Sequence, residues 1–262
     1  MKISVLVLAT SIAVAIGFDN GTMINRQPRV GGGSAVGIEK APYMAYVSAY
    51  VEGLESFLCS GVILSEQSVL TSSRCATACQ TILGQAIGRQ SKSECRVSVG
   101  TTGGEKDGSP VTRCVQDEAS GLGILFTTIS LSEKAKKIEI PDKETADGTG
   151  ILVSSYFNVG GGIRLNQAEG KVKIGADKKT ATVEPKTVYA CCETAMASKD
   201  HSQLIAFSVT IECKEGTPFV LIYPHRDWIN TNFGHRVQDT SMIIGALLLE
   251  MVVVAIANIT FN

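Results

Sequence analysis

The sequence predicts an all-β fold, built as a sandwich or a barrel. Between Val30 and about Ile229 of the 262 residues, short apolar and β-branched runs alternate with turns rich in glycine, serine and lysine. Amphipathic helical patterns do not separate these runs, and strands at such spacing are typical of all-β domains. The length fits one large domain or two small ones.

Eight apolar runs are expected to form strands. In order, they occupy residues 45–51, 59–65, 95–100, 123–129, 150–157, 171–175, 203–211 and 218–223. Each is rich in valine, isoleucine, leucine or aromatic residues and ends near a turn-forming residue. A helix is expected only near residues 227–232, DWINTN, where the strand pattern stops.

Both ends of the chain carry apolar segments outside this pattern. Residues 1–17 begin with a single lysine, continue as an apolar run and end in small residues, which predicts a cleaved signal peptide. Residues 18–29 are polar and are interpreted as a propeptide or linker. The tail, residues 233–262, contains a mostly apolar stretch at 242–261 that is near the minimum length for a membrane span. A removed lipid-anchor signal or a helix packed on the domain would explain this tail as well.

Charge and cysteine content narrow the classes of function. The net charge of −1 gives no electrostatic argument for nucleic acid as a partner, and no cofactor motif is present. The eight cysteines lack the spacing of metal ligands, so no metal site is expected. With a signal peptide, they are interpreted mainly as disulfide-bonded, and the expected location is extracellular.

Four segments, in this order, resemble the chymotrypsin-like (trypsin-like, S1) serine protease family, especially its secreted insect-type members. They are PRVGGGSAVGIEKAPYMAYV, FLCSGVILSEQSVLTSSRC, KIEIPDK and CKEGTPFVLIYPHRDWIN. The similarity runs from Arg29 to about Asn232. It implies two antiparallel six-stranded β-barrels, about residues 30–135 and 136–232, with a cleft between them and a short C-terminal helix.

The resemblance also locates the slots of the catalytic triad. In this family a histidine takes the proton of a serine hydroxyl, and an aspartate orients that histidine. The histidine slot holds Arg74, whose guanidinium stays protonated and has no acceptor, so it cannot act as a general base. The aspartate slot holds Gly121, which has no carboxylate.

The serine slot lies in the segment CCETAMASKDHSQLIAF, where the family has a glycine-flanked serine. Counting from Cys192 places Met196 in the slot, whereas counting from Cys191 places Ala195 there. Thr194 replaces the glycine of the oxyanion hole. The resemblance therefore implies a catalytically inactive member of the family.

The same comparison shows that the residues at the family's substrate-binding and activation positions also differ in this chain. Ala190 falls at the base of the specificity pocket, and Ser208 and Thr210 fall on the strand that pairs with substrate, where Thr210 would narrow the entrance. Cleavage after Arg29 would release an amino terminus at Val30. The family buries that ammonium against an aspartate, which this chain lacks, so cleavage is not expected to switch on catalysis.

The resemblance also implies part of the disulfide pattern. It pairs Cys59 with Cys75, and Cys192 or Cys191 with Cys213. A bridge between Cys79 and Cys95 is a local inference, and the state of Cys114 stays open.

Fold and secretion without catalysis favour a function in binding. The expected partner is a protein ligand such as a protease, an inhibitor or a pathogen-surface molecule, with membrane attachment through residues 242–261 left open. The alternative is a working serine-type endopeptidase whose nucleophile lies outside the assigned register. A product of a decaying gene is a third interpretation.

Overall fold

The computed structural model describes residues 30–51, 54–88, 93–102, 108–159, 162–190, 193–210 and 215–233. Four predictions fall outside these residues: the signal peptide, the propeptide with Arg29, the tail beyond residue 233, and the bridge from Cys191 or Cys192 to Cys213. Within the described residues, no helix has both the length and the hydropathy needed to cross a membrane.

The first half of the chain forms an antiparallel sheet of seven strands. Its spatial order is β7-β6-β3-β4-β5-β9-β8, and within the described residues the end strands β7 and β8 do not pair, so this sheet is a half-barrel. The strands are β3 (Met44–Val51), β4 (Leu54–Ser65), β5 (Ser68–Ser72), β6 (Glu94–Val99), β7 (Ser109–Pro110), β8 (Arg113–Asp117) and β9 (Leu122–Phe126).

The second half forms a closed barrel of six strands, also antiparallel. The order β10-β14-β15-β16-β12-β11 closes through pairing of β10 with β11, and β2 (Ser34–Ala35) adds to the outside of β11. The strands are β10 (Gly150–Val159), β11 (Gly162–Ile174), β12 (Thr180–Glu184), β14 (Thr194–Ser198), β15 (Leu204–Ser208) and β16 (Phe219–Leu221). Separately, β1 (Val30–Gly31) pairs with β13 (Tyr189–Ala190).

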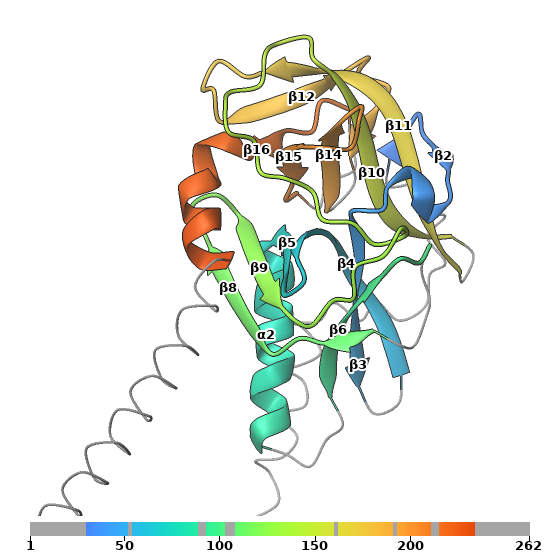
Figure 1. Ribbon diagram of the computed structural model, residues 1–262, viewed down its shortest axis with the longest axis vertical. Helices are drawn as coiled ribbons and strands as arrows, with labels where there is room; N and C mark the ends of the chain where they lie inside the picture. Colours follow the sequence, from blue (N-terminus) through green and yellow to red (C-terminus); the bar gives the residue numbers. More distant parts are fainter. Residues whose placement is uncertain are drawn as a thin grey trace, which may run out of the picture.

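The two sheets lie one above the other with a shared apolar core (Figure 1). Buried side chains from both halves meet in this core, among them Tyr46 and Phe126 from the first sheet and Tyr156 and Phe207 from the second. The ring of Tyr46 meets that of Tyr156 edge to face, with centroids 5.8 Å apart. Two smaller cores fill the second barrel and the space between the first sheet and its helix. The predicted all-β, trypsin-like fold is confirmed.

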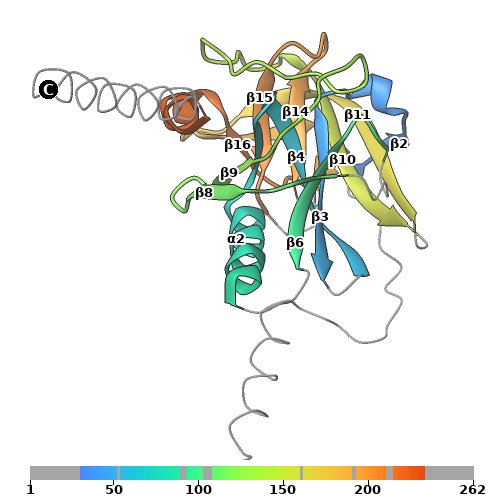
Figure 2. The ribbon, with the colours of Figure 1, turned by 60° about the horizontal axis from the view of Figure 1, so that its bottom comes forward.

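A helix that the sequence analysis did not predict, α2 (Ser73–Gly88), interrupts the first half. It packs against β5, β6, β8 and β9 (Figure 2). The prediction that a helix forms only near residues 227–232 was therefore wrong. The sequence does contain a physical reason for this helix: Cys75 and Cys79 are four residues apart, so a helix places both side chains on the same face. Both are buried.

The C-terminal helix expected from the sequence is present. The short turn η2 (Tyr223–His225) leads into helical residues 226–233. Arg226 Nη1 donates a hydrogen bond to the carbonyl of Asp142 at 2.9 Å, and Trp228 packs against the shared core. A 3-10 turn, η1 (Ile38–Lys40), lies near the start of the described chain.

Candidate functional site

Arg74, the residue in the histidine slot, joins the two halves of the molecule through Glu193. It lies in the first turn of α2, and its Nη2 donates to Glu193 Oε1 at 3.2 Å. The hydroxyl of Ser72, at the end of β5, donates to the same oxygen at 2.8 Å. Glu193 directly precedes β14 of the second barrel. We call Ser72, Arg74 and Glu193 the bridging cluster.

Burial makes this cluster asymmetric. The side chain of Glu193 is 1% exposed, whereas that of Arg74 is 55% exposed. Ser72 is fully buried, and its Oγ also accepts the backbone N–H of Cys75 at 3.1 Å. The carboxylate therefore lies beside the amino end of α2, whose dipole favours a negative charge. Among the described residues, Glu193 Oε2 has no hydrogen-bond partner.

Gly121, the residue in the aspartate slot, lies beside the start of α2. Its carbonyl accepts the backbone N–H of Ser73 at 2.7 Å. Its φ of +74° is in the left-handed region, which favours glycine. An ideal Cβ at this position would lie 3.0 Å from Cγ2 of Val209. The structure thus brings the histidine slot, the aspartate slot and the segment after β15 together.

The two candidates for the serine slot, Ala195 and Met196, both lie on β14 and are fully buried. Because successive residues of a strand face opposite sides, they enter different cores. Ala195 joins the core shared by the two halves, and Met196 packs inside the second barrel. The residue of this segment that contacts Arg74 is Glu193.

Pairing between strands shows where the residues of the pocket slots and of the activation site lie. Ser208 ends β15 opposite Thr194; it is buried, and its hydroxyl has no partner among the described residues. Thr210 follows it and is half-buried. Ala190 pairs with Val30 through β13 and β1. The start of the described chain therefore lies against the strand that carries the pocket slot.

Histidines that could replace the missing base lie away from the bridging cluster. His201 occupies the turn after β14, whereas Glu193 lies before that strand, and β14 itself spans about 13 Å at about 3.3 Å per residue. Its ring lies 5.8 Å from that of Tyr43, and burial lowers its pKa. His225 lies in η2, and burial lowers its pKa too. Neither has a polar contact with the cluster.

The described cysteines form two disulfides and one free thiol. Cys59 of β4 bonds Cys75, with Cα atoms 6.2 Å apart, and Cys79 bonds Cys95 of β6, with Cα atoms 5.3 Å apart. Cys114 on β8 has no disulfide partner among the described residues, and burial raises the pKa of its thiol to about 12, which favours the protonated form. In the described part of the chain, no three His, Cys, Asp or Glu residues gather as a metal site would require.

Sequence reasoning did not identify Glu193 or Ser72 as partners of Arg74. A signal for Glu193 does exist. It is an isolated acidic residue directly before a strand of small and apolar residues, TAMAS, and a buried carboxylate needs a compensating group. The identity of that group depends on tertiary contacts, because Ser72 and Glu193 are 121 residues apart.

Comparison with known proteins agrees with this architecture. The trypsin family profile matches residues 30–201. A structure titled HL collagenase aligns with a TM-score of 0.60 at 13% identity, covering 78% of this chain and 99% of that one. The scabies mite inactivated protease paralogue S-I1 aligns at 0.59 with 17% identity, covering 78% and 100%. A structure titled GrC aligns at 0.55 with 16% identity, covering 78% and 99%.

At these identities the structural matches show the fold alone, whereas the profile covers more than half of the sequence. No curated protein matches the chain. The two disulfides and the fold fit an extracellular protein. On the extent of the profile match, this chain belongs to the trypsin family.

Proposed function

We propose that this trypsin-family protein does not cleave peptides and acts by binding a protein partner, such as a protease, an inhibitor or a pathogen-surface molecule. The observation that carries the proposal is the bridging cluster. Where the family's chemistry needs a proton acceptor, this chain has the guanidinium of Arg74, ion-paired with the buried Glu193. An arginine side chain offers donors only.

The other members of the cluster do not supply a substitute pair of base and nucleophile. The Ser72 hydroxyl donates to Glu193, but Ser72 is fully buried and also accepts the N–H of Cys75, so a peptide carbonyl has no access to it. Ser208 is buried too and has no base beside it among the described residues. A serine hydroxyl without an adjacent base is a weak nucleophile.

The size of the loss makes residual peptide cleavage negligible. Removing the catalytic triad of a serine protease lowers kcat by about a millionfold. That factor corresponds to about 8 kcal/mol of barrier. Counted from Cys192, Thr194 replaces the oxyanion-hole glycine, which weakens the remaining stabilisation of the transition state further. Neither register places a serine in the nucleophile slot, because the two candidates are Ala195 and Met196.

Processing and location complete the proposal. Residues 1–17 act as a signal peptide and 18–29 as a propeptide, and residues 30–232 form the binding domain. Cleavage between Arg29 and Val30 does not generate activity. The protein is extracellular, and the apolar tail at 242–261 attaches it to a membrane or is removed. The match of the trypsin profile from residue 30 onward supports this division of the chain.

A fluorophosphonate probe tests the absence of catalysis. The purified chain is cleaved after Arg29 with an added protease, which is then removed, and is incubated with the probe beside an active trypsin as positive control. We expect no covalent labelling and no turnover of peptide substrates. Two serines of the second barrel are tested as relocated nucleophiles: Ser208, and Ser198 at the end of β14. Labelling that disappears in Ser198→Ala or Ser208→Ala would overturn the proposal and establish the alternative, an endopeptidase with a relocated nucleophile.

A further inference from the structure

The outer wall of the second barrel carries a hollow that the proposed function does not use. It has a volume of about 580 Å³ and is lined by residues of β10, β11, β12, the turn after β12 and the turn after β14. Gly150 of β10 lies opposite Lys171 of β11, which lies opposite Glu184 of β12. Lys199 crosses over Gly150, with its Cε 2.9 Å from where a Cβ would stand. Because Gly150 has no side chain, the stem of Lys199 can lie directly over its backbone.

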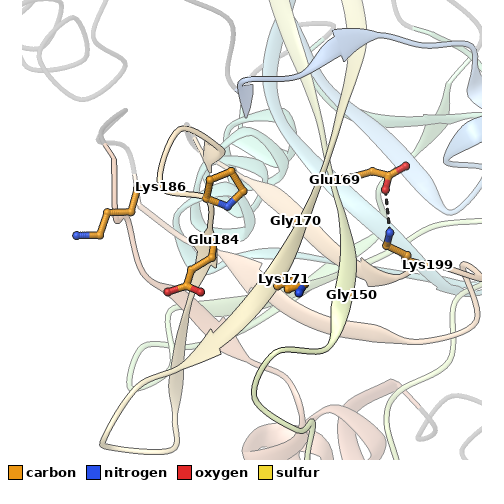
Figure 3. A pocket seen from close by; sticks show the side chains of 8 residues that line it. Gly150, Glu169, Gly170, Lys171, Glu184, Lys186 and Lys199 are labelled. Carbon is orange, nitrogen blue, oxygen red and sulfur yellow. Dashed lines mark hydrogen bonds and ion pairs between the residues drawn. The ribbon is translucent and has the colours of Figure 1, made fainter.

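The charges around this hollow do not cancel. Lys199 pairs with Glu169 at 2.8 Å, and just beside the hollow Lys173 pairs with Glu184 at 3.1 Å. Figure 3 shows Lys171 between Glu184 and the Glu169–Lys199 pair, and Lys186 on the far rim. Among the described residues neither Lys171 nor Lys186 makes an ion pair, although both are exposed.

Counting these groups gives a local excess of positive charge. The charged residues that line the hollow are three lysines and two glutamates, which leaves +1 on this wall, whereas the whole chain carries −1. Lys199 and Lys171 flank Gly150 on adjacent strands, so their backbones are two strand spacings, or about 10 Å, apart. A single exposed ion pair contributes only about 0–1 kcal/mol, so one small anion gains little from contact with this wall. A chain of linked anionic groups can occupy the positions together.

The lining of the hollow selects among polyanions. It consists of glycine, glutamate, lysine and proline, so it offers no aromatic face on which nucleic-acid bases could stack. It also offers no exposed apolar side chain for insertion into a lipid surface; the exposed large apolar residue of the described chain is Leu131, outside the hollow. Lysine ammonium groups bind anionic groups as point charges, without the planar geometry of arginine. We propose that this wall, centred on Lys171 and Lys186, binds a sulfated polysaccharide.

Heparin serves as the probe, and its affinity for the full chain is measured by calorimetry at several NaCl concentrations. Wild type binds, and fully desulfated heparin does not. The double substitution Lys171→Gln with Lys186→Gln lowers affinity at least tenfold at physiological salt. Because two cations no longer displace counterions, the slope of log affinity against log salt becomes shallower by about one to two units.

The matched control is Lys136→Gln with Lys143→Gln, which makes the same change in net charge at two exposed lysines outside the hollow. It should change heparin affinity less than twofold, and both variants should melt at the wild-type temperature. Failure of wild type to bind heparin, or an equal loss in the control, would overturn the proposal. Neither result bears on fluorophosphonate labelling, which tests the proposed function separately.

Discussion

At the scale of single residues, the bridging cluster has two partners in very different environments. Glu193 is almost completely removed from water, whereas more than half of the Arg74 side chain is exposed. Breaking an ion pair by removing one partner is costly when the other stays buried and charged. Removing the buried charge of Glu193 should cost much less free energy of unfolding, because the exposed guanidinium of Arg74 is then solvated by water.

This asymmetry predicts unequal effects of the two substitutions. Arg74→Ala should lower the free energy of unfolding by about 1–2 kcal/mol, a value reduced from that of a fully buried pair because Arg74 is solvated. Glu193→Gln should change it by less than about 1 kcal/mol, and adding it to Arg74→Ala should recover most of the loss. Urea unfolding with intact disulfides measures all three. If the double variant is as unstable as Arg74→Ala, the buried carboxylate is not the source of the loss.

Gly121 gives a second prediction, with a control elsewhere in the chain. Both Gly121 and Gly148 have positive φ angles, of 74° and 76°, but a Cβ at Gly121 would meet Val209 whereas one at Gly148 would meet nothing within 4 Å. Gly148→Ala should cost about 1 kcal/mol for the left-handed backbone alone. Gly121→Ala should cost more, and Val209→Ala in the same chain should remove that excess. Equal losses for the two alanine variants in thermal melts would contradict the contact.

At the scale of elements, two disulfides hold α2 onto the first sheet. Cys75 and Cys79 project from one face of the helix and bond Cys59 on β4 and Cys95 on β6. Each bridge spans 16 residues of sequence. Since α2 begins with Ser73 and Arg74, the bridges also hold the amino end of the helix at the boundary where it meets Glu193. The scaffold thereby positions the bridging cluster.

Removing one bridge tests how far this scaffold depends on it. In the chain-entropy model, a loop of this length predicts a loss of about 3 kcal/mol for Cys79→Ala with Cys95→Ala. Far-UV circular dichroism in urea measures the loss, and Cys114→Ala serves as a control because its thiol is unpaired among the described residues. A loss below about 1 kcal/mol would mean that packing of α2, not the bridge, stabilises this region.

At the scale of the whole molecule, many secondary-structure elements could be predicted from local sequence patterns, whereas contacts between distant residues could not. Short apolar and β-branched runs between turn residues predicted eight strand segments, but β5, β8, β12 and β14 lie outside those runs. Resemblance added the barrels, which alternation alone could not distinguish from a sandwich. α2 was missed because its run SRCATACQTILGQAIG is short of large apolar residues and is stabilised by disulfides. Glu193 was missed because its partners lie about 120 residues away, a distance at which no periodic pattern operates.

The shared core predicts that the two halves unfold together. Tyr156 of β10 is fully buried; its hydroxyl donates to the carbonyl of Thr101 at 2.6 Å, and its backbone N–H donates to Ser60 of β4 at 3.1 Å. Circular dichroism and the fluorescence of Trp228, the chain's one tryptophan, should therefore give coincident transitions in urea. Tyr156→Phe should shift both by about 1–1.5 kcal/mol.

Tyr223→Phe is the matched control for this shift, because the hydroxyl of Tyr223 makes no hydrogen bond among the described residues. The guanidinium carbon of Arg226 lies 4.9 Å from the centroid of the Tyr223 ring, and phenylalanine keeps this contact. This variant should unfold with wild-type stability. If the Trp228 signal changes before the circular dichroism signal, the C-terminal helix or the second barrel unfolds alone. The contacts between the halves would then be too weak to couple them, and the bridging cluster could form and break without loss of either barrel.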